Sequence, residues 1–273
     1  MDGELVPQSD QRALPQSIAG LVAEWEMFGL RIVTVADVAQ ILGVAASSRQ
    51  VERAVRNLVS HRWIRPLTAR GSYEFLAASG GPYGSGDPLV EARAVSLRRP
   101  GLLLQVVGDG AAFLRGYADR APATYGIAVD KAATRSRALE RAYVVIRTTH
   151  KRLFGAPELD GVPVSDATRL LVDLALWLEA AGDLRDADHW LARALRDADP
   201  RSAADAVDLI GTAAAARMAY LADRFGASDI AASVRDRMGG RRARTSIGPA
   251  SEKLHGRDAR LGVDDRVGVA RAR

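Results

Sequence analysis

The chain has 273 residues, of which 48% are hydrophobic and 26% charged, a composition typical of a globular protein with about two domains. Its formal net charge is +5, but 35 of the 38 basic residues are arginine and three are lysine, so the placement of the arginines is more informative than their number. The lack of cysteine excludes disulfides and thiolate ligands. Because the N-terminal segment also lacks the pattern of a signal peptide, we expect a cytoplasmic protein.

Three amphipathic helices are predicted in the first 61 residues. The segment 15–30 repeats its apolar residues at helical spacing. A second helix is expected to begin at Thr34, a residue type that favours the N-cap, and to end at Gly43. The third is expected to begin with Ser47 and Gln50, which have the spacing of a capping box.

A short hairpin is predicted directly after the third helix, over residues 63–76, with Gly71 in its turn. The order helix, helix, helix, hairpin is that of a winged helix-turn-helix. We therefore expect residues 1–76 to form a winged helix-turn-helix DNA-binding domain. Residues 77–88 are rich in Gly, Pro and Ser, and we interpret them as a linker.

The third predicted helix carries its arginines on one side. At about 100° per residue, Arg49, Arg53 and Arg56 lie opposite the apolar residues of that helix. Residues 47–71 contain six arginines and one glutamate, although residues 1–76 hold eight basic and eight acidic side chains and are neutral as a whole. A solvated, locally paired face is the alternative, but the order of the elements favours duplex DNA. The residues expected to bind DNA are Ser47, Ser48, Arg49, Gln50, Arg53, Arg56, Asn57, Arg62, Arg65 and Arg70.

A second domain is predicted over residues 89–240. It begins with elements of different types: strands are expected within the ranges 101–108, 124–130 and 141–149, and a helix within 109–117. A helix capped by Ser165 and apolar on most faces is expected to run to about Ala180, at the centre of the second core. Further helical segments are expected at 184–199, 200–226 and 227–240.

The predicted fold class is α+β, with an N-terminal winged helix-turn-helix followed by a mixed, mostly helical C-terminal domain with a small sheet. Residues 241–273 have nine basic and four acidic side chains and no sustained apolar period. We expect this segment to be a disordered basic tail.

No arrangement of residues typical of catalysis or metal binding is found in the sequence. The four histidines, His61, His150, His189 and His255, are scattered and do not have the spacing of metal ligands. No nucleophile can be placed beside a base and an orienting group. We therefore expect neither a metal, nor a cofactor, nor an enzymatic activity.

Two stretches of the second domain resemble the AbiEi family of antitoxins from bacterial toxin–antitoxin and abortive-infection systems. The first lies within 164–174 and the second within 217–226, and "GSYEF" in the hairpin is also similar. The resemblance covers most of residues 15 to 230. The positions that match are Val164, Ser165, Arg169, Leu170, Leu171, Asp173, Leu174, Arg217, Tyr220, Leu221 and Gly226.

The resemblance implies two roles. The winged domain of the family binds inverted repeats in the promoter of its own operon and represses transcription, and the C-terminal domain opposes a cognate nucleotidyltransferase-like toxin. The central helix is too apolar to contact a partner, so partner contacts are expected from polar faces of the later helices. The candidates are Arg193, Arg196, Arg217 and Arg224.

Two other functions are compatible with an N-terminal DNA-binding domain. One is a ligand-sensing winged-helix transcriptional regulator without a toxin partner. The other is a nucleic-acid-processing enzyme with a winged accessory domain, against which the lack of a catalytic constellation argues. No membrane association is expected, because the most apolar stretch is far shorter than the ~20 residues of a membrane-spanning helix.

Overall fold

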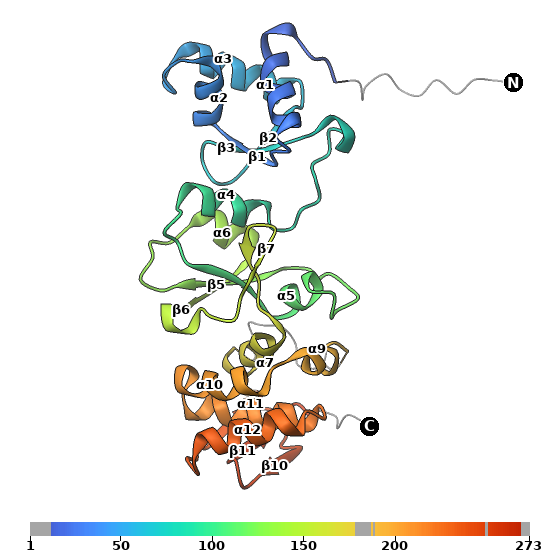
Figure 1. Ribbon diagram of the computed structural model, residues 1–273, viewed down its shortest axis with the longest axis vertical. Coiled ribbons are helices and arrows are strands. Elements are labelled where there is room, and N and C mark those ends of the chain that lie inside the picture. The colour runs from blue at the N-terminus through green and yellow to red at the C-terminus, as the bar shows by residue number, and fades with distance from the viewer. Residues whose placement is uncertain (1–11, 178–186, 188, 249–250, 269–273) are drawn as a thin grey trace, which may run out of the picture. The chain divides into compact units, whose positions relative to one another are not determined.

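Figure 1 shows a computed structural model of the chain, which describes residues 12–177, 187, 189–248 and 251–268. The structure is mixed α+β, as predicted, with small sheets and mostly helical secondary structure. It divides into two compact units, residues 1–100 and 101–273. Among the described residues, no helix is long and apolar enough to span a membrane.

The described residues of the first unit form four α-helices and a small antiparallel sheet. Its three strands follow the order β1-β3-β2, so the strand nearest the start of the chain pairs with the last. α4 packs against β1 and β3 and is drawn below them in Figure 1. The elements are α1 (Gln16–Met27), β1 (Ile32–Thr34), α2 (Val35–Leu42), α3 (Arg49–Ser60), β2 (Ile64–Pro66), β3 (Ser72–Phe75) and α4 (Val90–Arg98), with a 3₁₀ turn at Ala78–Gly80.

The core of this unit is formed by apolar residues from helices and strands. Trp25 of α1 is fully buried and meets Phe75 of β3 edge to face, with ring centroids 5.5 Å apart. Leu58 of α3 packs in the same cluster. The predicted cap of α2 is confirmed: the Thr34 side chain accepts from the Asp37 amide, and the Asp37 carboxylate accepts from the Thr34 amide.

The predicted linker over residues 77–88 is not the boundary between the two units. The first unit continues to Pro100 and includes α4, which the sequence analysis did not predict. Four apolar residues of α4 are buried: Val90, Ala92, Ala94 and Val95. The apolar residues do not keep to one side of α4, so the helical periodicity on which the prediction relied is weak there.

The second unit begins with a three-stranded sheet of order β4-β5-β6. β4 and β5 are antiparallel, whereas β5 and β6 are parallel. Each strand and helix predicted within 101–149 is found, and α6 and the β7–β8 hairpin are additional. The bounds are β4 (Leu104–Val107), α5 (Gly108–Leu114), β5 (Gly126–Asp130), α6 (Arg137–Ala142), β6 (Val144–Thr148), a 3₁₀ turn (His150–Arg152), β7 (Glu158–Leu159) and β8 (Val162–Pro163).

Four helices, α5, α9, α10 and α11, pack against α7, as predicted for a central helix. Residues 167–175 of α7 are all buried. The cap is Asp166, whose side chain accepts from the Arg169 amide, and not Ser165 as predicted. The predicted end near Ala180 lies outside the described residues. The helices are α7 (Ala167–Leu176), α9 (Leu191–Asp197), α10 (Pro200–Ile210), α11 (Thr212–Arg224) and α12 (Ser228–Met238).

The segment 200–226 forms two helices, α10 and α11. They are separated by Gly211, whose φ of +83° and ψ of 162° lie outside the helical region. A left-handed φ of this kind favours glycine, because other residues carry a Cβ that clashes there. The break lets α11 turn and pack against both α7 and α12.

The prediction of a disordered tail is wrong for the described part of residues 241–273. Three short strands, β9 (Thr245–Ile247), β10 (Gly256–Asp258) and β11 (Val263–Asp265), form a sheet of order β10-β11-β9. Ile247 and Val263 are fully buried, and the Tyr220 hydroxyl donates to the Asp265 carboxylate at 2.9 Å. Strands of three residues are too short to show the alternation on which the prediction relied.

Candidate nucleic-acid interface

The position of α3 is fixed by its apolar face. Val51, Ala54 and Leu58 are buried in the core of the first unit. Their spacing of three and four residues places them on one side of the helix, as predicted. The opposite side of α3 therefore faces away from that core.

The opposite side of α3 carries an arginine face, defined by Arg49, Arg53 and Arg56. All three side chains are exposed. Arg56 donates from Nε to the carbonyl of Glu52 in its own helix at 3.4 Å. Arg49 and Arg53 make no side-chain hydrogen bond or ion pair with any residue in the described parts of the chain. Two guanidinium groups of this face are therefore free to bind an external anion.

The start of α3 differs by one residue from the predicted cap. Ser48 is the N-cap, and its hydroxyl accepts from the Val51 amide at 3.3 Å. Ser47 precedes the helix and is exposed, as is Gln50 in the first turn. The two serines and the helix N-terminus therefore lie at the same end as Arg49, where exposed backbone amides favour phosphate.

The β2–β3 hairpin divides the remaining arginine candidates. Arg70 is exposed beside Gly71 in the turn, and Arg62 is exposed between α3 and β2 with a left-handed φ of +57°. Arg65 differs, because its guanidinium lies 2.5 Å from the carboxylate of Glu74 on β3. Glu74 is buried, so Arg65 neutralises an internal charge, while its own side chain stays half exposed.

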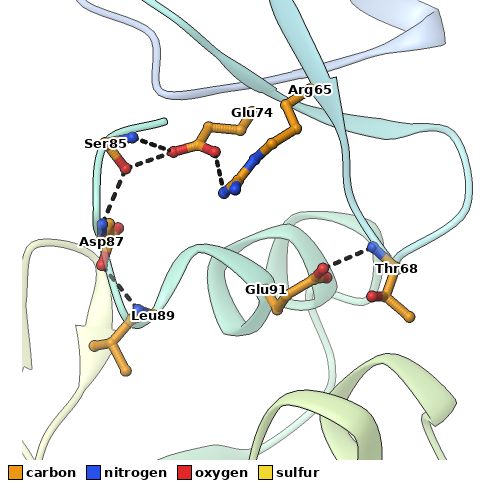
Figure 2. A network of polar contacts seen from close by, with 7 residues as sticks. All are labelled: Arg65, Thr68, Glu74, Ser85, Asp87, Leu89 and Glu91. Carbon is orange, nitrogen blue, oxygen red and sulfur yellow. Dashed lines mark hydrogen bonds and ion pairs between the residues drawn. The ribbon is translucent and has the colours of Figure 1, made fainter. Parts of the chain in front are cut away.

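A network of polar contacts ties the hairpin to the segment that follows it (Figure 2). The Glu74 carboxylate accepts from both the amide and the hydroxyl of Ser85, at 2.7 and 2.5 Å. On α4, Glu91 accepts from the amides of Thr68 and Ala69 in the hairpin turn, at 2.7 and 3.3 Å. The hairpin is thus held at its base and at its turn by the chain between 85 and 91.

The four arginines predicted to contact a partner protein differ in their surroundings. Arg193 forms two hydrogen bonds with Asp119, at 2.7 and 3.0 Å, which lower the pKa of the exposed Asp119 carboxyl. Arg196 is exposed. Arg224 lies over the Tyr220 ring at 5.8 Å.

Arg217 differs from the other three, because its guanidinium is held by hydrogen bonds within the second unit. Its half-buried guanidinium donates to the carbonyl of Ala175 at 2.7 Å and to the hydroxyl of Thr245 at 2.8 Å. Burial lowers the pKa of this guanidinium. Arg217 therefore joins α7, α11 and β9 inside the second unit.

A buried polar cluster lies at the junction of β4, α5 and α7. Arg169 and Asp173 are fully buried, and Arg169 Nε donates to Asp173 at 2.6 Å. The other carboxylate oxygen accepts from the Ser165 hydroxyl at 2.7 Å and from the Gly108 amide at 3.3 Å. Burial raises the pKa of Asp173, whereas the Arg169 charge and these donors oppose that rise. Gln105 completes the cluster by donating to Ser165.

Aromatic rings enclose the Arg169 guanidinium. Its carbon lies 4.4 Å from the centre of the Phe154 ring and 5.1 Å from that of Trp177. A guanidinium over an aromatic face is attracted by the ring electrons, and the attraction is stronger in a desolvated site. This cluster was not predicted from the sequence, although the i, i+4 spacing of Arg169 and Asp173 is the signal of such a pair.

No metal site is apparent in the described ranges, where no group of three or more His, Cys, Asp or Glu side chains is placed to hold an ion.

The comparisons with known proteins identify a fold but no family. No family model and no curated protein matches this chain. Among solved structures, the chain is similar to the crystal structure of the RV2827C protein from Mycobacterium tuberculosis, with a TM-score of 0.79 and 22% sequence identity over 96% of each chain. At this identity the likeness shows the fold alone, which the chain shares with that protein along nearly its whole length.

Proposed function

We propose that the first unit is a winged helix-turn-helix domain and that α3 is its recognition helix, which binds promoter DNA. The observation that carries this proposal is the arginine face of α3, exposed directly opposite a buried apolar face. Guanidinium groups can read guanine bidentately in the major groove or bind phosphate. In this proposal the β2–β3 hairpin is the wing.

The surroundings of the arginine face support the same proposal. Gln50 and Asn57 flank the arginines on α3 and supply amide groups of the kind that read adenine. Arg62 and Arg70 extend the basic region to the hairpin. Because the first 76 residues are neutral overall, the attraction to DNA comes from this local concentration of charge rather than from the domain as a whole.

We further propose that the second unit is an antitoxin that counteracts a nucleotidyltransferase-like toxin, and that the DNA-bound protein represses its own operon. This half of the proposal rests on the resemblance to the AbiEi family. The positions that carry the resemblance build the interior of the unit: Arg169 and Asp173 form the buried pair, and Leu171 and Leu221 are fully buried. The resemblance therefore concerns the architecture of the domain, and the toxin contact is expected on its exposed surface, where Arg193, Arg196 and Arg224 are candidates.

The DNA-binding half is tested by changing Arg53 to alanine in the full chain. If Arg53 reads a base, affinity for the promoter falls by ~1–3 kcal/mol while binding to unrelated duplexes is nearly unchanged. If Arg53 binds phosphate, the affinities for both DNAs fall together, and the slope of log affinity against log salt concentration decreases by about one. Unchanged affinity for both DNAs would contradict a contact at Arg53.

The antitoxin half is tested by growth rescue in cells that express the product of the adjacent gene. The full chain with Arg49, Arg53 and Arg56 changed to alanine is expected to rescue growth from a constitutive promoter, because the second unit is unaltered. The same chain with the further change Leu171→Ala is not expected to rescue growth. Leu171 is fully buried, and removing its side chain lowers the free energy of unfolding by ~2–5 kcal/mol. Rescue lost with the arginine variant, despite normal protein levels, would indicate protection by repression instead and favour a ligand-sensing regulator.

A further inference from the structure

The C-terminal sheet has two chemically different faces. Residues opposite each other across the strands share a face, and Arg257, Asp264 and Ser246 are such a row. The neighbouring row contains Ile247 and Asp265, which are buried. That inner face meets α11 through the bond from Tyr220 to Asp265. The row with Arg257 therefore lies on the outer face.

Three arginines lie near the carboxylate of Asp264 on the outer face. Arg257 donates to both oxygens of Asp264, at 2.5 and 3.0 Å, and lowers the pKa of that carboxyl, to which the charges of Arg244 and Arg266 also contribute. Alternation along the strands places Arg244 outward, because Thr245 points inward to Arg217. All three positive charges therefore stabilise this one carboxylate.

Two further arginines lie at one end of this sheet. Arg260 is in the turn between β10 and β11, and Arg242 precedes β9; both are exposed. The turn adjoins the start of β9, since the Thr245 amide donates to the Gly262 carbonyl and a Cβ on Gly262 would lie 2.8 Å from the Ala243 oxygen. The side chains of Arg242, Arg244 and Arg260 make no hydrogen bond or ion pair within the described residues.

We propose that this outer face, with Arg242, Arg244 and Arg260 at its edge, is a second contact for nucleic acid that binds the phosphate backbone of duplex DNA without reading sequence. Phosphate is the anion that the fork of a guanidinium binds bidentately. A protein partner fits less well, because the centre of a protein interface is depleted in charge and enriched in aromatic residues. The row Arg257, Asp264 and Ser246 offers only polar groups.

This contact is independent of the arginine face on α3. It supplies the second unit with an affinity for DNA of its own and makes the whole chain, rather than the first unit alone, the DNA-binding protein. Two linked contacts raise the overall affinity because the second forms at high effective concentration. The proposal therefore goes beyond promoter binding by the first unit, and either of the two DNA contacts can be disproved without the other.

The test is the salt dependence of binding, measured by fluorescence anisotropy with a duplex of arbitrary sequence. The background is the full chain with Arg49, Arg53 and Arg56 changed to alanine, so that α3 does not contribute. In this background Arg242, Arg244 and Arg260 are changed to alanine together. The matched control removes the same charge elsewhere on the second unit, through Arg137→Ala, Arg141→Ala and Arg201→Ala, all at exposed positions.

The expected result is that the slope of log affinity against log salt falls by about 2 to 3 when the sheet arginines are removed, as for the loss of three phosphate contacts, and changes less in the control. Replacing the same three arginines with lysine is expected to retain most of the slope, because the point charges remain. Equal slopes for the alanine variant and the control would overturn the proposal. A loss confined to duplex RNA would overturn the assignment to DNA.

Discussion

The buried pair of Arg169 and Asp173 shows how single residues organise the second unit. A charge transferred from water to a protein interior is costly unless it is paired and hydrogen-bonded. Here Asp173 accepts from Arg169, Ser165 and the Gly108 amide, so one carboxylate links α7 to the start of α5. The pair therefore fixes the position of the central helix against the sheet. It helps to determine how α7 packs as well as how stable the unit is.

Removing one member of this pair should be more harmful than removing both. Asp173→Ala leaves the Arg169 charge buried and unpaired, at an expected cost of ~3–5 kcal/mol in the free energy of unfolding. The double variant Arg169→Met and Asp173→Leu leaves neither charge and should recover much of that loss. Urea unfolding of both variants measures the difference. A double variant that is less stable than Asp173→Ala would show that the pair is not the source of the cost.

Gly110 is a second position at which one residue limits the packing of this unit. A Cβ built there lies 2.6 Å from Cδ1 of the Tyr125 ring, closer than atoms in contact approach. Gly110→Ala must therefore displace a buried ring, and we expect a loss of ~1–3 kcal/mol in urea unfolding. Gly20 of α1 is the control, because nothing lies within 4 Å of its Cβ position. Gly20→Ala should be neutral or slightly stabilising, and equal stability of the two variants would contradict the packing argument.

At the scale of the element, the hairpin depends on a helix that follows it in the chain. Glu91 of α4 accepts from the amide of Thr68 (Figure 2) and from that of Ala69, which gives the hairpin turn a fixed partner outside the sheet. Amides bound to a carboxylate form stronger hydrogen bonds than those bound to neutral acceptors. The position of Arg70, next to these amides, is therefore coupled to α4.

The expected effect of Glu91→Ala is local loosening of the hairpin turn. The amides of Thr68 and Ala69 should exchange with solvent faster, because their acceptor is lost, while exchange in α1 stays unchanged. The cost in unfolding free energy is expected to be ~1 kcal/mol. Hydrogen exchange measured by NMR checks this residue by residue. Unaltered exchange at both amides would mean that α4 does not hold the turn.

Elements with a strong local signal were predictable from the sequence, and those that depend on tertiary contacts were not. The apolar spacing of α3 and the cap at Thr34 are local, and both are confirmed. The ion pair between Arg65 and Glu74 depends on the register of β2 and β3, so it could not be predicted from the sequence around either residue. The strands around Val263 are stabilised by contacts with α11, which no window of their own sequence contains.

At the scale of the whole molecule, the chain consists of two units whose boundary lies near Pro100. The glycine-rich stretch 77–88 looks like a linker in composition, but Ser85 within it is bonded to Glu74. Composition reports the conformational freedom of an isolated segment, whereas the contacts of the folded chain decide whether it is free. The first unit that can be separated is therefore 1–100 rather than 1–76.

Two fragments test this boundary. Residues 1–100 retain α4 and its contacts with the hairpin, and we expect them to unfold cooperatively. Residues 1–76 lose both Ser85 and Glu91, and they should be less stable by at least ~1 kcal/mol, because two carboxylate contacts are removed. Thermal unfolding followed by circular dichroism compares the two. Equal stability of the two fragments would indicate that the boundary lies in the stretch 77–88.

The central claim, that the arginine face of α3 binds DNA, is tested most directly by titrating the intact protein with the DNA upstream of its own gene. Changing Arg49, Arg53 and Arg56 to alanine should lower the affinity at least about 100-fold, since each contact contributes ~1–3 kcal/mol and every 1.4 kcal/mol is tenfold. The control variant with Arg137, Arg141 and Arg201 changed to alanine should keep most of its affinity for this DNA. Full affinity in the first variant, with its fold intact by circular dichroism, would contradict the account.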